Sequence, residues 1–187
     1  FDAIALLHHG IDAVSAMSSN AFPEQSLREL ATARGGKLPK LIWALDNEPG
    51  AHRYTRRWVT EARTLGYVCE AAQLPQRNNR KFDWNDLHQR WMFIDDAAER
   101  AAQIEKDLKT ARHEGALLIA ESPAEKALLM YDWNSRGEFH FRFGNRLFWF
   151  KLDLEKFDRA MRAFENSDDH EDKLLNDRQK RDKALQE

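Results

Sequence analysis

The chain has 187 residues, of which 42% are hydrophobic and 32% charged, and its formal net charge is −2 at pH 7. This composition is that of a folded protein with room for one domain, or for one domain with an appendage. The near-neutral charge excludes binding to nucleic acid through the charge of the whole chain, so any such binding needs a local basic patch. The single cysteine, Cys69, excludes an internal disulfide and a cysteine-based zinc site.

Helical and β-compatible segments alternate through the first half of the chain. We predict helices over residues 1–8, 23–34 and 50–65, and β-strands over residues 11–17, 41–45 and 67–74. This order predicts an α/β fold in which helical crossovers connect the strands of a parallel sheet. Because the chain begins at Phe1 inside a helical pattern, we expect a preceding strand that it does not contain, and hence a longer protein.

The second half has a different pattern. Residues 88–113 read as one long, charged helix that acts as a connector. A small α+β module comes next, for which we predict a strand at 115–120, a helix at 123–131, a β-hairpin around Gly144-Asn145 and a helix at 154–164. Residues 166–187 are almost all charged and are expected to form a frayed helix or a linker.

Aromatic residues alternate along the first strand of the predicted hairpin. Phe139, Phe141 and Phe143 lie on one face of that strand. We expect this face to be packed inward, against either Leu147 and Trp149 or Phe148 and Phe150. The alternative is a platform on which unpaired bases stack.

The strongest candidate site comes directly after the apolar run Leu41–Leu45, which ends in Asp46-Asn47-Glu48-Pro49-Gly50. Ligand sites of open α/β sheets lie at the carboxyl ends of the strands, where Asp46 and Glu48 are expected to project. Two carboxylates this close repel each other unless a cation lies between them, and Mg²⁺ is the natural partner of such oxygen ligands. The alternative is that both acids only cap the next helix.

Basic residues lie on both sides of the predicted strand at 67–74, on the same rim as this acidic pair. Such residues could grip the phosphates of a nucleotide or a template, and the alternative is a solvated helix face. They are Arg53, Arg56 and Arg57 in the helix and Arg77, Arg80 and Lys81 in the loop after the strand.

Three segments together resemble the Toprim domain of DNA primases. Phe1 to Leu6, with Gly10 shortly after, resembles the end of its first motif, Glu-Gly-x-x-Asp-x-x-x-Leu. Asp46-Asn47-Glu48 with Gly50 resembles its second motif, Asp-x-Asp-x-x-Gly. Asp83-Trp84-Asn85-Asp86-Leu87 resembles the third acidic motif in the form found in mobile-element primases. The resemblance covers residues 1–91, and the second half resembles the region C-terminal to the Toprim domain in primase-helicase proteins of integrative elements and plasmids.

The resemblance implies a Rossmann-like core of about four parallel strands. It also implies nucleotidyl transfer with Mg²⁺ or Mn²⁺, on a single-stranded DNA template, with nucleotides as substrates and a helicase as partner domain or protein. Asp2, Asp46 and Glu48 would be the catalytic residues, and Asp46, Glu48, Asp83 and Asp86 the metal ligands, with Asn85 as a further candidate. The general acid/base Glu of the first motif would precede Phe1, so we expect weak metal binding and little or no synthesis from this chain alone.

The predicted organisation has four parts: a Toprim-like domain at 1–91, a connecting helix at 92–113, the α+β module at 114–165 and a charged helical tail at 166–187. Two other functions stay open, another Toprim chemistry such as a nuclease or a topoisomerase-like strand transferase, and a degenerate scaffold that binds single-stranded DNA or partner proteins. No run reaches the roughly 20 apolar residues of a membrane span, and no signal peptide is visible, so we expect a cytoplasmic protein without membrane contact.

Overall fold

The computed structural model of the chain describes residues 2–16, 21–75, 82–165, 179–180 and 183. Contacts divide the chain into two compact units, residues 1–119 and residues 120–187. The predicted binding residues Arg77, Arg80 and Lys81 and almost all of the predicted tail lie outside the described residues. No helix of the described part is both long and apolar enough to cross a membrane.

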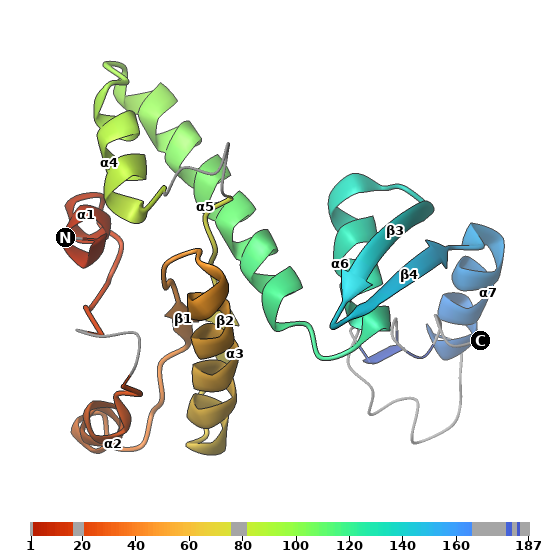
Figure 1. Cartoon of the computed structure of the whole chain (residues 1–187), viewed down its shortest axis with the longest axis horizontal. Helices are drawn as coiled ribbons and strands as arrows, with labels where there is room; N and C mark the ends of the chain where they lie inside the picture. The colour runs from red at the N-terminus through yellow and green to blue at the C-terminus, as the bar shows by residue number, and fades with distance from the viewer. Residues whose placement is uncertain (1, 17–20, 76–81, 166–178, 181–182, 184–187) are drawn as a thin grey trace. The chain divides into compact units, whose positions relative to one another are not determined.

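The first unit is a mixed α/β structure built on a short parallel sheet (Figure 1). Strands β1 (Leu41–Trp43) and β2 (Cys69–Ala71) pair in parallel, with Leu41 opposite Cys69. In the described residues this sheet has two strands. Its helices are α1 (Asp2–His8), α2 (Glu24–Ala33), α3 (Pro49–Thr64), α4 (Trp84–Met92) and α5 (Ala97–Ile119).

The predicted strand at 11–17 is not present in its described part, residues 11–16. The backbone N–H of Ile11 bonds to the carbonyl of Leu6, so the segment starts as the closing turn of α1. Ile11 and Ala13 are partly buried against the core, whereas Val14 is 94% exposed. Their apolar character therefore reflects packing of a loop and not pairing of a strand.

Two hydrophobic clusters hold the first unit together. One joins α1, α4 and α5 to the ends of the strands, and the other joins α2 and α3 to the strands. Their fully buried members include Trp91 in the first cluster and Trp58 and Val59 in the second. The sheet thus lies between helices, as a parallel sheet requires.

The chain over 88–119 differs from its prediction. The long helix is divided, with α4 ending at Met92 and α5 beginning at Ala97, and residues 115–119 continue α5 and do not form a strand. The prediction of a strand at 115–120 is therefore wrong. A short apolar run fits a buried strand and a buried helix equally well, and here the packing of α5 decides.

Helix α5 belongs to the core of the first unit and is not only a connector. Ala111 and Gly115 are buried, and the carbonyl of Ala111 accepts a hydrogen bond of 2.8 Å from the backbone N–H of Gln73. A Cβ atom on Gly115 would overlap the backbone of Ala71 and Ala72. Glycine at this position lets the helix backbone touch the end of β2, and the boundary between the two units accordingly falls after Ile119.

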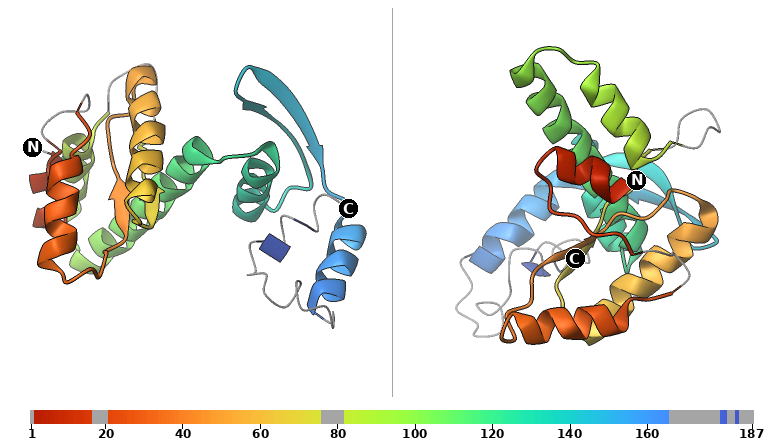
Figure 2. Two further views of the ribbon diagram at one scale, coloured as in Figure 1. Left: turned by 90° about the horizontal axis from the view of Figure 1, so that it is seen from below. Right: turned by 90° about the vertical axis from the view of Figure 1, so that its left-hand side faces the viewer.

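Helices α1 and α4 lie side by side, as two views agree (Figures 1 and 2). Just after the end of α1, the Nε2 atom of His9 is 2.9 Å from Nδ1 of His88, in the middle of α4. The ring of His8 lies against both, and Trp91 meets His9 edge to face. Burial, and then the neighbouring charges of His88, His8 and Arg100, lower the pKa of His9. The hydrogen bond and the ring contacts of this histidine cluster hold the end of α1 against α4.

The second unit contains α6 (Pro123–Asn134), β3 (Glu138–Phe143), β4 (Arg146–Lys151) and α7 (Leu154–Glu165). The strands form the predicted hairpin, with Gly144 in the turn at φ +59°. Phe141 is 7% exposed and stacks on Phe148, so its predicted inward orientation is confirmed. Phe139 stacks on Phe150, which places Phe148 and Phe150, not Leu147 and Trp149, on the inner face.

Candidate functional site

The ends of the two strands are tied together next to the predicted acidic motif. The side-chain amide of Gln73 donates to the carbonyl of Leu45 over 3.4 Å, and the amide of Asn47 donates to the carbonyl of Leu74. The indole of Trp84, in α4, donates to the carbonyl of Ala44 over 3.1 Å. The backbone on both sides of Asp46 is therefore fixed by hydrogen bonds, and Asp46 lies just after β1, near the start of α4.

Helices α1 and α4 bring two more carboxylates to the same place. The Oδ1 atom of Asp2 accepts a hydrogen bond of 3.2 Å from the backbone N–H of Asn85, which joins the start of α1 to the start of α4. Burial raises the pKa of Asp2, and the negative charges of Asp83 and Asp46 raise it further, against the opposing effect of the Asn85 hydrogen bond. Asp2, at the start of α1, is thus close enough to Asp83 and to Asp46 to be repelled by both of their charges.

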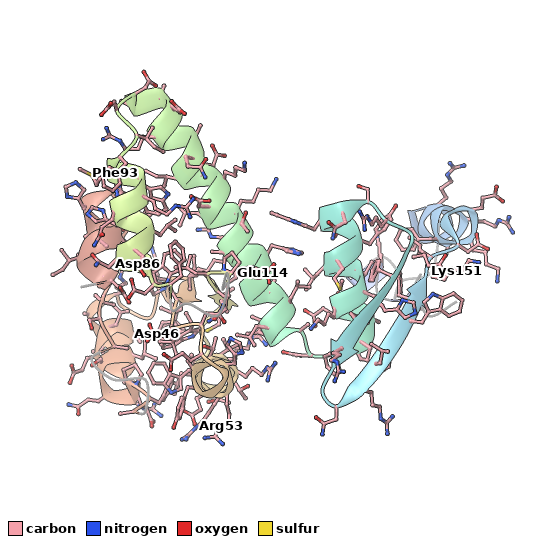
Figure 3. All side chains as sticks on the ribbon, turned by 45° about the horizontal axis from the view of Figure 1, so that its top comes forward. Asp46, Arg53, Asp86, Phe93, Glu114 and Lys151 are labelled. Atoms are coloured by element: carbon pink, nitrogen blue, oxygen red, sulfur yellow. The ribbon has the colours of Figure 1, made fainter. Side chains whose placement is uncertain are left out.

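The predicted third motif forms the beginning of α4. Asp83 is its N-cap, and its Oδ1 atom accepts from the backbone N–H of Asp86 over 2.9 Å. In return, Oδ2 of Asp86 accepts from the backbone N–H of Asp83 over 3.1 Å. This capping box fixes the direction of Asp83 and uses one carboxylate oxygen of Asp86 for helix initiation. Figure 3 shows Asp46 and Asp86 on the side of the unit where α4 approaches the strand ends.

Glu48 stands at the N-cap position of α3, but its side chain makes no capping hydrogen bond. Its side chain is exposed, and its charge is not among those that act on Asp2. Of the predicted site carboxylates, Asp46 and Asp83 therefore act on Asp2, and Glu48 does not. The assignment of Glu48 and Asp86 as metal ligands stays a prediction.

The three carboxylates suit a Mg²⁺ ion that is also bound by substrate phosphates. Among the described residues, no three His, Cys, Asp or Glu side chains are placed to hold a metal by themselves. Mg²⁺ does not need such a cage, because it keeps several waters and binds through one or two carboxylates together with phosphates of the substrate. A divalent cation would also relieve the repulsion that raises the pKa of Asp2. The donor set thus suits an ion shared with a phosphate and not a closed structural metal site.

The arginines of α3 have partners within the protein. Arg56 donates through Nε to the carbonyl of Leu118, over 2.9 Å, and so holds the last turn of α5. Arg57 forms an ion pair with Glu61 at 2.6 Å, and the guanidinium of Arg53 lies 5.7 Å from the ring centroid of Tyr54. Arg56 in particular has a structural role, which the sequence prediction of a phosphate-binding face did not include.

Asn47 and His52 are site residues that the sequence analysis did not select. The side-chain oxygen of Asn47 is hydrogen-bonded to Nε2 of His52, one turn into α3. Burial, and then the charge of Arg56, lower the pKa of His52, so the ring is neutral near pH 7. Since Asn47 uses its amide nitrogen on Leu74, its oxygen accepts, and Nε2 of His52 carries the proton. The sequence contained one signal for Asn47, which is its position as a polar residue between the two acids of the motif.

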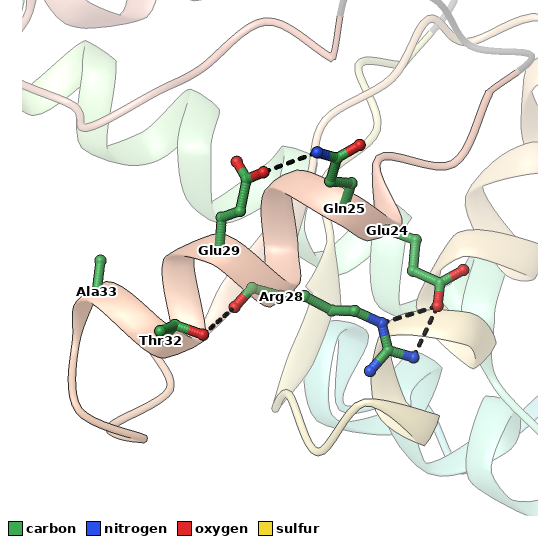
Figure 4. A pocket seen from close by; sticks show the side chains of 6 residues that line it. All are labelled: Glu24, Gln25, Arg28, Glu29, Thr32 and Ala33. Carbon is green, nitrogen blue, oxygen red and sulfur yellow. Dashed lines mark hydrogen bonds and ion pairs between the residues drawn. The ribbon is translucent and has the colours of Figure 1, made fainter.

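A shallow hollow elsewhere on the first unit does not belong to this site (Figure 4). Its lining side chains all come from α2, and they satisfy one another, as in the pairs Arg28–Glu24 and Gln25–Glu29. It contains no residue of the acidic motifs, and we assign it no function.

Comparison with known proteins finds one family. A family model described as Toprim-like matches residues 1–88, a range that begins with α1 and includes the acidic motifs at Asp46 and Asp83. No curated protein and no solved structure shows a significant match to the chain. The match supports a Toprim domain in the first half of the chain, of the kind found in Mg²⁺-dependent enzymes that act on nucleic acids.

Proposed function

We propose that the Toprim-like domain of residues 1–88 belongs to an enzyme that carries out Mg²⁺-dependent nucleotidyl transfer on nucleic acid, as the primase part of a DNA replication protein of a mobile element. The observation that carries the proposal is the position of Asp2, which bonds to the start of α4 and is acted on by the charges of Asp83 and of Asp46, the residue that follows β1. The narrower assignment to a primase that works with a helicase on single-stranded DNA rests on the resemblance of Asp46–Gly50 and Asp83–Leu87 to primase motifs.

The residues of the site divide the work between binding and positioning. Asp46, with Asp2 or Asp83, would hold the ion, which supplies positive charge for the oxygens of the transferred phosphoryl group. Asn47 fixes the backbone next to Asp46 by bonding to Leu74 of the neighbouring strand end. His52 holds the side chain of Asn47 in place and, being neutral, adds no positive charge that would compete with the ion.

A topoisomerase-like function would need a tyrosine nucleophile. Tyr67 is 3% exposed, and its hydroxyl donates to the carbonyl of Leu27 over 2.6 Å. It is therefore a core residue that ties α2 to the sheet. This argues for nucleotidyl transfer, or for a nuclease, over strand transfer through Tyr67.

The experiment is a Mn²⁺ titration of the whole chain by calorimetry, alone, with a ribonucleoside triphosphate and with a short single-stranded oligonucleotide. An ion shared with substrate phosphates should bind more tightly when the triphosphate is present. Asp46→Asn should weaken this binding at least about tenfold. Asp96→Asn is the matched control, since Asp96 caps α5 through the backbone N–H of Glu99, outside this site.

The outcomes separate the candidate functions. Tighter Mn²⁺ binding with the triphosphate, lost in Asp46→Asn and kept in Asp96→Asn, supports a nucleotidyl transferase. Tighter binding with the oligonucleotide alone, together with Mg²⁺-dependent cleavage of it, would replace the proposal with a nuclease. Equal Mn²⁺ affinity of the wild type and Asp46→Asn under all conditions would leave a scaffold without metal chemistry and refute the proposal.

A further inference from the structure

The hairpin of the second unit has an outer face, opposite the phenylalanines. Because side chains alternate along each strand, this face carries every second residue of β3 and of β4. The register places His140 opposite Trp149, Arg142 opposite Leu147 and Glu138 opposite Lys151. These six residues make up the outer hairpin face, and Lys151 is labelled in Figure 3.

The outer hairpin face exposes large apolar side chains. Trp149 is 59% exposed and Leu147 is 67% exposed, although the phenylalanines of the same two strands stack on each other on the inner face. The indole of Trp149 is also oriented, because its Nε1 atom donates to Oε1 of Glu138 over 3.1 Å. An oriented, exposed indole on a sheet presents a flat aromatic surface to a partner.

The charge of the outer hairpin face is mainly positive. Arg142 and Lys151 belong to it, and both are exposed. Within the described part of the chain, neither of these two cations has a carboxylate within ion-pair distance. The one acid of the face, Glu138, is used to orient Trp149.

We propose that the outer hairpin face binds single-stranded nucleic acid, with Trp149 stacked on an unpaired base and Arg142 and Lys151 at the adjacent phosphates. An aromatic ring accepts the face of any base once the base is unpaired, and cations beside the ring neutralise the backbone. Neighbours on one sheet face lie about 5–8 Å apart, so one nucleotide can reach both the indole and a cation. The face would thus be a second contact for a template strand, separate from the carboxylate site.

A protein partner fits this face less well. Lysine and the acidic residues are depleted at protein interfaces. Here Lys151 follows Trp149 by two residues on the same side of β4 and has Glu138 as its cross-strand neighbour. The proposal shares its class of ligand with the proposed function, but it does not depend on the carboxylates or on a metal.

The test measures the affinity of the whole chain for a short fluorescein-labelled oligo(dT) by fluorescence anisotropy, in EDTA. Trp149→Ala should weaken binding roughly 5- to 150-fold, the loss of one stacked base. Trp149→Phe keeps an aromatic ring and should recover most of the affinity. Arg142→Gln and Lys151→Gln should each reduce the slope of log affinity against log salt by about 0.7.

Phe93→Ala is the matched control, because Phe93 is an exposed aromatic residue of the first unit, 86% exposed. It should leave the affinity unchanged. The proposal is wrong if the wild type does not bind the oligonucleotide, if Trp149→Ala binds as the wild type does, or if Phe93→Ala weakens binding equally. It is also wrong if Trp149→Ala changes only the oligomeric state of the chain, since the face would then be an interface between copies.

Failure of this proposal is distinguishable from failure of the proposed function. If Trp149→Ala loses oligonucleotide binding and no Mn²⁺ binds at Asp46, the outer hairpin face binds nucleic acid but the proposed enzymatic function is refuted. If Mn²⁺ binds normally at Asp46 and Trp149→Ala keeps its oligonucleotide affinity, the proposed enzymatic function is supported but the binding role of the outer hairpin face is refuted.

Discussion

Replacing Gly115 with alanine tests the close approach of α5 to β2, on which the arrangement of the first unit depends. A Cβ atom at this position would lie 2.6 Å from the backbone nitrogen of Ala72 and still closer to the carbonyl group of Ala71. These are backbone atoms of a strand end in the core, so they cannot turn away as a side chain would. We therefore expect the helix and the strand to separate in this variant.

The magnitude of the loss combines two effects. Overpacking of a well-filled core costs about 1–3 kcal/mol. Separation also lengthens the 2.8 Å hydrogen bond from the backbone N–H of Gln73 to Ala111, and an unsatisfied buried N–H costs about 1–3 kcal/mol. The higher helix propensity of alanine offsets about 0.5–1 kcal/mol of this destabilisation. The net loss is then about 1–5 kcal/mol, a large part of the stability of a typical domain at its upper end.

Urea unfolding followed by tryptophan fluorescence measures this loss, and the chain offers a matched control. Gly50 lies in α3, and a Cβ atom there would meet nothing within 4 Å. Gly50→Ala should therefore raise the free energy of unfolding by about 0.5–1 kcal/mol, whereas Gly115→Ala lowers it. If Gly115→Ala unfolded at the same urea concentration as the wild type or higher, α5 would not touch β2 as described.

Three further predictions concern charge and packing. Asp2 has a raised pKa, so its ionised form is disfavoured in the folded chain, and the stability it contributes is lost as pH rises above its ordinary value of 3.8. Asp2→Asn keeps an oxygen that accepts the hydrogen bond of Asn85, and it should therefore raise the melting temperature at pH 7 in EDTA, by the equivalent of about 0.2–1 kcal/mol. An unchanged or lower melting temperature would contradict the repulsion between the carboxylates. His9 has a lowered pKa, so the unfolded chain takes up its proton first as pH falls below the ordinary 6.5, and stability should fall with it. The fall in melting temperature between about pH 6.5 and 5 should be smaller in His9→Gln, and an identical fall would show that the histidine cluster does not contribute. Phe141→Ala should lower the free energy of unfolding by about 3–5 kcal/mol and leave the oligonucleotide affinity unchanged. Leu147→Ala is the control, because Leu147 is 67% exposed, and its free energy of unfolding should stay within about 0.5 kcal/mol of the wild type. If Phe141→Ala lost oligonucleotide binding but kept its stability, the inner face would be the stacking surface.

Most of the helices could be predicted because their signals are local. Gly10 and Gly35-Gly36 have positive φ angles directly after α1 and α2, where the sequence predicted the helices to end. The hairpin turn at Gly144-Asn145 was found for the same reason. Each of these features depends on residues within one turn of the chain, so their spacing in the sequence is enough to locate them.

The continuation of α5 through Gly115 could not be predicted in this way. An apolar segment that comes after a glycine satisfies the pattern of a strand, and a glycine inside a helix is unfavourable by itself. The helix is favoured here by contact with the end of β2, about forty residues earlier in the chain. Local preference is a weak guide where tertiary packing of this kind is available.

The same distinction applies to the candidate site. The sequence determined that the chain carries acidic motifs at Asp46 and Asp83 in the order of a Toprim domain, because the identity and spacing of residues are enough for that. Only the tertiary structure decided that the charges of Asp46 and Asp83 act on Asp2, and that Asp86 takes part in the capping box of α4. It also decided that Arg56 holds α5 and that Trp149 faces outward. The partners of these side chains are set by the packing of segments that are distant in the chain, and the spacing of nearby residues does not determine such packing.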